Sequence, residues 1–383
     1  MLLRTCVLLF AFGLASCAST PEDLFVPVSA TAPGASSVDL LVATTRRSAA
    51  NPAELYSGER GEGLSFANVV VSIPPDSTRQ PGDIDWPRTA PGNPATDFVA
   101  TRVSRFDGKA TRAWLDSHGS AANKHRVLIF VHGYNNRFSD AVFRATQIVH
   151  DCDAEVTPIL FTWPSRGSVF AYGYDRESAN LSRDAFEHLL DMLVRDPAVR
   201  EVDILAHSMG NALVLETLRR MAIRDRRIPA KIDDVMLAAP DVDVDVFQNE
   251  ILDMGDPHPK FTLFASRDDK ALALSRWIWG SDARLGTIDP KAEPYQSRLA
   301  AEHVNVFDLT DVQSDDGVNH NKFVTSPELV RLVGKRWASG QTFSDSNESI
   351  GDQVLGAAAN GVGVLETSVE QAETGDADAP AAK

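Results

Sequence analysis

Cysteine is scarce in this chain: only three of its 383 residues are cysteines, namely Cys6, Cys17 and Cys152. Three thiols so far apart in sequence provide neither a disulfide framework nor the four ligands of a structural zinc site. Long apolar runs are lacking as well. No run reaches the roughly 18 to 20 residues that a membrane-spanning helix needs, which excludes a protein with several membrane spans.

Basic residues are outnumbered by acidic ones. The 37 lysines and arginines face 53 aspartates and glutamates, which gives a formal net charge of −16. This charge repels nucleic acid, so we expect no nucleic-acid partner. The sequence contains no H-E-x-x-H motif, no His/Cys cluster with metal-ligand spacing and no phosphate-binding loop. We therefore expect neither a metal nor another cofactor.

The N-terminus has the features of an export signal: a positively charged start, the apolar stretch Cys6–Leu14, and small residues before Cys17. The segment Leu14-Ala15-Ser16-Cys17 resembles the bacterial lipobox. This resemblance implies that residues 1–17 are a signal peptide ending at a cysteine that is lipidated. Because residue 18 is not Asp, it also implies a lipid-anchored protein of the outer membrane that faces the periplasm and contacts the membrane through its anchor only. An ordinary cleaved signal with a chance cysteine is the alternative.

Composition divides the remaining chain into three segments. Residues 18–37 are rich in Ser, Thr, Pro and Ala, which predicts a flexible tether. Residues 38–338 form the predicted domain. Residues 339–383 contain eight acidic residues and one basic residue, which predicts an acidic, disordered tail.

Within the domain, short strands are followed by an alternation of strands and helices. Strands that are apolar on both faces and alternate with helices predict an α/β fold, with a mainly parallel, doubly wound sheet covered by helices on both faces. The expected strands are 38–44, 67–73, 97–101, 127–131, 156–163, 202–206, 234–238, 261–265 and 303–308, and the expected helices are 139–152, 176–194, 211–223 and 327–337.

The strongest local signal surrounds Ser208. In Ala206-His207-Ser208-Met209-Gly210, a buried strand ends, a serine occupies a sharp turn and a helix begins at once. This pattern is typical of a nucleophile elbow, with Ala206 in place of the first glycine of G-x-S-x-G. Small residues are needed two positions before and after the serine, because the strained turn brings these positions close together.

A second strand–turn motif, Val131-His132-Gly133-Tyr134, lies upstream. A loop of this kind supplies half of the oxyanion hole beside such an elbow. Backbone amides there stabilise the negative charge that develops on a carbonyl oxygen. The expected donors are the amides of Tyr134 and Met209, and we expect His132 to order the loop rather than to transfer protons.

A serine nucleophile needs a base, and the base needs an orienting acid. Catalytic groups gather at the carboxyl ends of parallel strands. His320 follows the strand residues Val304–Asp308, whereas His303 precedes them, so His320 is the predicted base. For the acid, Asp269 follows the preceding strand and is preferred, with Asp241 and Asp268 as alternatives.

Five segments together resemble a bacterial α/β-hydrolase family catalogued as an esterase/lipase-like domain of unknown function. They are Phe130–Asn136, Phe161–Ser165, Ala206–Asn211, Leu237–Asp241 and Asp269–Leu272. The resemblance covers about residues 38–338. It implies the α/β-hydrolase fold and a Ser–Asp–His triad, but no substrate.

These residues predict a serine hydrolase that cleaves a carboxylic ester through an acyl-enzyme, acting on a small-molecule or lipid ester. Thioesterase or acyltransferase chemistry would use the same groups. A non-catalytic envelope lipoprotein that uses the hydrolase fold as a binding scaffold is the alternative from another class. The presence of all three triad residue types at consistent strand ends favours the enzyme.

If Cys17 is lipidated, the protein should fractionate with membranes and partition into detergent. A Cys17→Ala variant should then fail to mature normally and should lose this partitioning. Cell fractionation and phase separation measure both properties, and equal behaviour of the two proteins would contradict lipidation.

Overall fold

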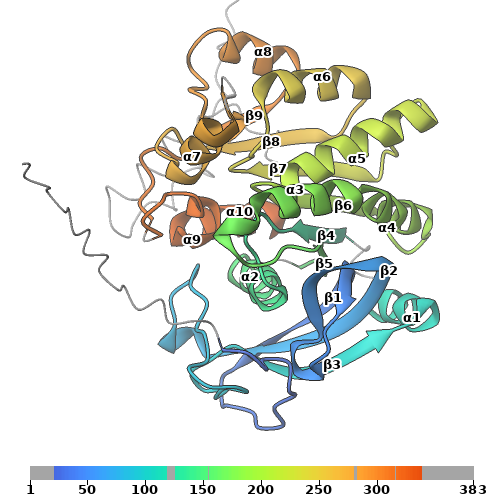
Figure 1. The fold of residues 1–383 in the computed structure, drawn as a ribbon, viewed down its shortest axis with the longest axis vertical. Helices are drawn as coiled ribbons and strands as arrows, with labels where there is room; N and C mark the ends of the chain where they lie inside the picture. The colour runs from blue at the N-terminus through green and yellow to red at the C-terminus, as the bar shows by residue number, and fades with distance from the viewer. Residues whose placement is uncertain (1–20, 119–125, 154, 280–282, 315, 339–383) are drawn as a thin grey trace, which may run out of the picture.

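The computed structural model describes residues 21–118, 126–153, 155–279, 283–314 and 316–338 (Figure 1). The expected signal peptide with Cys17 and the expected tail 339–383 lie outside the described residues. No described helix is both long and apolar enough to cross a bilayer.

The described residues form a nine-stranded sheet with the order β3-β2-β1-β5-β4-β6-β7-β8-β9. β1 pairs with β2, and β2 with β3, in antiparallel fashion, whereas every pair from β1–β5 to β8–β9 is parallel. The prediction of a mainly parallel sheet is therefore confirmed. The strands are β1 (Ser36–Ser48), β2 (Tyr56–Ile73), β3 (Val99–Phe106), β4 (Arg126–Val131), β5 (Thr157–Thr162), β6 (Glu201–His207), β7 (Ile232–Ala238), β8 (Lys260–Ala265) and β9 (Asn305–Asp308).

Both faces of the sheet are buried, as the continuous apolar strands predict. In β4, Val127, Ile129 and Val131 belong to one core cluster, and Leu128 and Phe130 to the other. Side chains from α1, α3, α4, α5, α6 and α8 complete the first cluster. Side chains from α2, α9, α10 and the N-terminal segment complete the second.

Figure 1 shows helices on both sides of the sheet. The helices are α1 (Gly108–His118), α2 (Phe138–Asp151), α3 (Tyr172–Leu181), α4 (Arg183–Arg195), α5 (Gly210–Asp225), α6 (Val244–Met254), α7 (Lys270–Trp279), α8 (Tyr295–Ala301), α9 (Lys322–Thr325) and α10 (Pro327–Ala338).

The expected single helix over residues 176–194 is two helices, α3 and α4. Ser182 lies between them, and its hydroxyl donates to the carbonyl oxygen of Ser178 at 2.7 Å. A serine hydroxyl that bonds the backbone of the preceding turn competes with regular helix geometry.

The expected flexible tether is wrong for residues 21–37. Leu24 and Phe25 are buried, and the Phe25 ring lies 4.9 Å from the Phe138 ring, centroid to centroid. The Phe25 amide also donates to the carbonyl oxygen of Ala53 at 2.8 Å. Two apolar side chains are enough to fix a segment whose average composition is that of a linker, because burying each stabilises by about 1.5 to 3 kcal/mol.

Replacement of Phe25 by Ala should lower the free energy of unfolding by roughly 3 kcal/mol, because it leaves a cavity against α2. The neighbouring Val26, which is 43% exposed, provides the matched control: Val26→Ala should change stability by less than about 0.5 kcal/mol. Urea unfolding measures both. Equal effects would mean that the segment is not packed.

Candidate active site

Ser208 occupies the turn between β6 and α5 with a backbone φ of +52°. This left-handed conformation is strained for a residue with a side chain, and such strain marks functional turns. The turn is held by hydrogen bonds. The Ser208 amide donates to the carbonyl oxygen of Ala238 at 2.9 Å, and the Asn211 side-chain amide donates to the carbonyl oxygen of Ser208 at 2.9 Å.

Two glycines allow the elbow to touch the end of β4. A Cβ on Gly133 would lie 2.7 Å from the Ser208 Cβ, and a Cβ on Gly210 would lie 2.5 Å from the carbonyl oxygen of His132. Neither distance is possible for a real side chain. The sequence requires glycine at both positions because two backbone segments meet there.

The amides of Tyr134 and Met209 flank this contact. Within the described residues, neither amide donates a hydrogen bond to a protein acceptor. The Asn136 side chain holds the first loop by donating to the carbonyl oxygen of Tyr134 at 2.8 Å. Both amides are therefore candidates for binding an oxyanion, as the sequence predicts.

His320 and Asp269 lie together although 51 residues separate them. His320 Nδ1 is 2.7 Å from Asp269 Oδ2. Asp269 is buried, and its other oxygen accepts the Leu272 amide at 2.9 Å, so the carboxylate is fixed at the start of α7. No hydrogen bond joins Ser208 Oγ to the His320 ring in the described residues. Such contacts are often long when no substrate is bound.

Two further carboxylates shape the His320 loop. Asp316 accepts the backbone amides of Asn319, His320 and Asn321 at 2.5, 2.8 and 2.7 Å. Burial opposes ionisation of Asp316, but these donors outweigh it and lower the pKa of the carboxyl group. Asp316 thus keeps its charge and stiffens the loop that carries the imidazole.

The first alternative acid, Asp268, contacts the residues on either side of His320 rather than its ring. It forms an ion pair with the Lys322 ammonium at 2.8 Å and accepts from the Asn319 side chain at 2.7 Å. Asp268 therefore supports the loop.

The second alternative acid, Asp241, is buried in a separate network. It accepts from the Tyr172 hydroxyl at 2.7 Å and from the Ser275 hydroxyl at 2.8 Å, and it pairs with Arg284 at 3.3 Å. All of its close side-chain partners are thus groups other than the histidine. Its amide still contacts the elbow, because it donates to the carbonyl oxygen of Ser208 at 3.2 Å.

Two other histidines, His207 and His303, occupy positions in the fold that differ from that of His320. His207 Nε2 donates to the carbonyl oxygen of His320 at 3.2 Å, and the two rings are 4.8 Å apart. Burial, together with the neighbouring His320, lowers the pKa of His207 to about 3, so the ring stays neutral. His303 lies before β9, at the opposite end of that strand from His320.

His132 orders its loop, as expected. Its ring is buried, stacks on Trp163 with a centroid distance of 4.8 Å, and contacts the Thr162 hydroxyl at 2.9 Å. Burial, reinforced by the charge of Arg46, lowers the pKa of His132 well below its usual value. A neutral, enclosed imidazole is unsuited to proton transfer with a substrate.

Sequence reasoning missed Arg46, at the end of β1. Its buried guanidinium donates to the Thr162 hydroxyl at 2.8 Å, and to the carbonyl oxygens of Ser165 and Asn136 at 2.8 and 2.9 Å. Burial lowers the pKa of Arg46 to about 10, so the group remains charged at neutral pH. The only available signal was a basic residue directly after an apolar strand.

One carboxylate cluster lies at the amino ends of the strands, away from Ser208. Oxygens of Glu201, Asp203 and Asp233 lie within 4.8 Å of one another. Arg126 pairs with Glu201 and lies 3.3 Å from Asp203, so a guanidinium already supplies the positive charge that a cation would bring.

The comparisons with known proteins concern the domain. Residues 107–336 match the family model described as "Alpha/beta hydrolase of unknown function (DUF900)". No curated protein was found to be similar to the chain.

Solved structures with a related fold include three hydrolases. A predicted CIB-like hydrolase from Thermoplasma acidophilum is 18% identical, with a TM-score of 0.34, over 56% of this chain and 87% of that one. A thermostable esterase from Pseudomonas putida is 10% identical, with a TM-score of 0.40, over 81% of this chain and 85% of that one. A fungal esterase from Rhizomucor miehei is 13% identical, with a TM-score of 0.37, over 80% of this chain and 83% of that one. Likeness at this level says nothing about activity. The family model matches more than half of the sequence, and the chain belongs to this family of α/β hydrolases.

Proposed function

We propose that this α/β hydrolase is a serine esterase that cleaves a carboxylic ester through an acyl-enzyme. Ser208 is the nucleophile, His320 the base and Asp269 the group that orients the base. The observation that carries the proposal is the 2.7 Å contact between His320 Nδ1 and the buried Asp269, at the same edge of the sheet as the strained serine.

The reaction follows from these positions. Asp269 accepts a hydrogen bond from the Nδ1–H group of His320 and stays ionised, which leaves Nε2 unprotonated and able to take the proton of the Ser208 hydroxyl. Ser208 Oγ then attacks the ester carbonyl carbon, and the carbonyl oxygen becomes an oxyanion that the amides of Tyr134 and Met209 bind. When the intermediate collapses, the alkoxide leaves with the proton from His320. Water, deprotonated by His320, releases the acid from Ser208 in the second half of the reaction.

The contacts around the serine favour catalysis over a passive scaffold. A scaffold has no need of two glycines that let backbones touch at Ser208, nor of Tyr134 and Met209 amides that donate to no acceptor among the described residues. Thioester or acyl-transfer chemistry would use the same groups, so the choice of an ester rests on a direct assay. Acyl esters of graded chain length, tested with the purified protein, identify the preferred bond and acyl group.

A fluorophosphonate probe should label the wild type stoichiometrically, because an activated serine beside an oxyanion hole reacts with it. Ser208→Ala should abolish labelling.

His320→Ala should lower kcat by roughly 10³-fold or more, whereas the matched control His303→Ala should change it little. Circular dichroism verifies the fold of each variant. A folded wild type that is neither labelled nor active on short-chain esters would favour the binding scaffold.

The three aspartates can be distinguished with the same probe. Asp269→Asn should slow labelling by roughly 10³- to 10⁴-fold, because the imidazole loses the partner that fixes its tautomer. Asp241→Asn and Asp268→Asn should slow it far less, because these carboxylates contact other groups. Slow labelling confined to Asp241→Asn would show that the acid had been chosen wrongly.

A further inference from the structure

Five large apolar side chains are exposed on the segments that carry the candidate active site. Val169 and Phe170 follow β5, Leu274 and Trp277 lie on α7, and Val318 precedes His320. We call these five residues the apolar rim. Their exposed fractions are 63%, 96%, 56%, 80% and 42%, respectively.

The rim is tied to the catalytic groups by direct contacts. The Tyr134 hydroxyl donates to the carbonyl oxygen of Val169, and the Tyr134 ring lies 5.1 Å from that of Tyr172. α7 begins one residue after Asp269, and its Lys270 amide donates to the carbonyl oxygen of Val318 at 2.9 Å. The rim therefore lies on the same segments as Tyr134, Asp269 and His320 rather than on unrelated parts of the fold.

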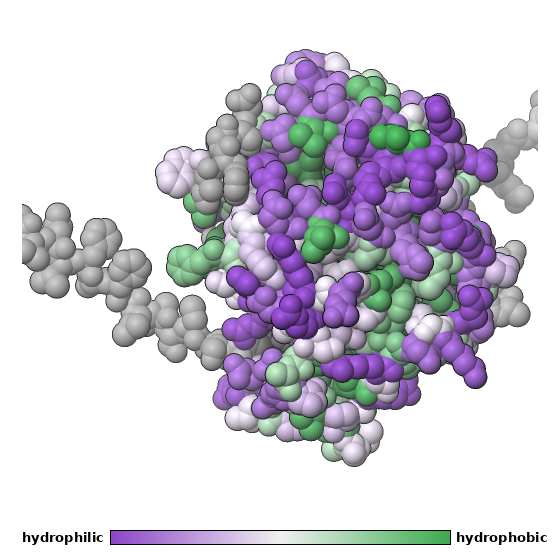
Figure 2. Space-filling view, turned by 45° about the vertical axis from the view of Figure 1, so that its right-hand side comes forward, coloured by the Kyte–Doolittle hydropathy of each residue, from purple (hydrophilic) through white to green (hydrophobic). Residues whose placement is uncertain are grey.

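Exposed apolar residues are common singly, but five at the edge of one site need an explanation. Five other large apolar residues are also exposed, but they lie on the N-terminal segment and on α3, α5 and α6: Val26, Leu181, Ile223, Val246 and Leu252. Figure 2 shows that hydrophilic residues predominate on the face turned to the viewer. Exposed Phe and Trp side chains are stabilised when they enter the boundary between water and an apolar phase.

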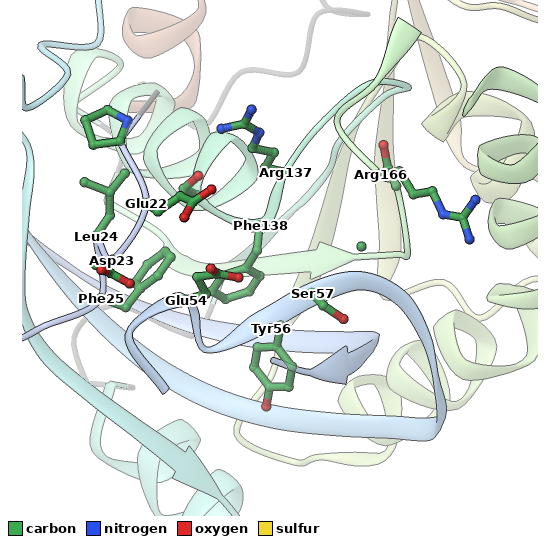
Figure 3. Close-up of a pocket in the computed structure, with 14 residues that line it drawn as sticks. Glu22, Asp23, Leu24, Phe25, Glu54, Tyr56, Ser57, Arg137, Phe138 and Arg166 are labelled. Atoms are coloured by element: carbon green, nitrogen blue, oxygen red, sulfur yellow. The ribbon is translucent and has the colours of Figure 1, made fainter. Parts of the chain in front are cut away.

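The described chain begins at the same edge. A cavity of about 300 Å³ is lined by the first described residues, Pro21–Phe25, and by Arg137, Ser165 and Arg166 (Figure 3). These last three belong to the segments that follow β4 and β5, which also carry Tyr134 and Phe170. Cys17 is four residues before Pro21, a distance of at most about 14 Å in an extended chain. Lipid attached to Cys17 would thus place a membrane near this edge.

We propose that the apolar rim inserts into the surface of a zwitterionic lipid bilayer, and that the ester is an acyl lipid taken from that bilayer. The inference rests on the proposed esterase function and adds a second membrane contact to the anchor expected at Cys17. A zwitterionic surface fits because the net charge of −16 disfavours an anionic one.

The test compares two presentations of one leaving group. The parent, Phe170→Ser/Trp277→Ser and the control Ile223→Ser/Leu252→Ser are prepared as the same full-length chain, so any affinity of the first twenty residues is common to all. Activity is measured on dissolved p-nitrophenyl acetate and on p-nitrophenyl palmitate in phosphatidylcholine vesicles. The rim variant should lower the ratio of vesicle to dissolved activity at least fivefold, and the control should leave it within twofold. An unchanged ratio in the rim variant would overturn the proposal.

Binding is measured separately, so that failure of catalysis does not hide the result. Brominated phosphatidylcholine should quench part of the tryptophan fluorescence of the parent, and this part should disappear in Trp277→Phe. A parent that hydrolyses neither ester but shows this quenching would overturn the esterase while retaining the membrane contact. No quenching, or a dimer in size-exclusion chromatography that only the rim variant dissociates, would overturn the bilayer as the occupant.

Discussion

The site depends on one constraint, the close approach of two backbone segments at Ser208. Gly133 and Gly210 leave no room for a Cβ, because the end of β4 and the elbow after β6 touch at this point. Tyr134 and Met209 directly follow the two residues that meet there, Gly133 and Ser208. It also depends on β4 and β6 being neighbours in the sheet with Val131 opposite Ala206. An error of one residue in this register would move the loop by about 3.3 Å and would end the close approach of Gly133 to Ser208.

The antiparallel part of the sheet supports this contact through Arg46. β1 lies beside β5, and Arg46 projects from its end to the carbonyl oxygens of Asn136 and Ser165. A buried guanidinium bound mostly to neutral oxygens is costly to desolvate. The neighbouring carboxylate of Asp175 offsets part of this cost, and it accepts the amides of Asn135 and Arg166 at 3.2 and 3.0 Å. Two opposite buried charges thus hold the loops after β4 and β5 together.

The sequence predicted those parts of the site in which a local pattern and a strand end coincide. Ser208 follows an apolar strand and precedes a helix, so its place at the carboxyl edge of the sheet is a local property. His320 and Asp269 were reached by the same rule, because each follows a strand. Arg46 could not be predicted in this way. Its partners lie about 90 to 120 positions away in the chain, and no periodicity reports such contacts.

Two predictions about the fold were wrong because each relied on the average character of a segment. Residues 18–37 have the composition of a linker, but Leu24 and Phe25 decide the structure because α2 offers an apolar surface to them. The helix expected over 176–194 has the correct period, yet the single hydroxyl of Ser182 divides it. In both cases the contacts of one or two side chains outweigh the average pattern of the segment.

Asp268 and Asp269 are neighbours of the same residue type, and their positions in the fold give them different contacts. Both follow β8, and both reach the loop that carries His320. Asp269 is enclosed at the start of α7, where a backbone amide fixes one oxygen and leaves the other for the imidazole. Asp268 is more exposed and already satisfied by Lys322 and Asn319. One residue of difference in a turn therefore separates a carboxylate that contacts the His320 imidazole from one that holds the loop around it.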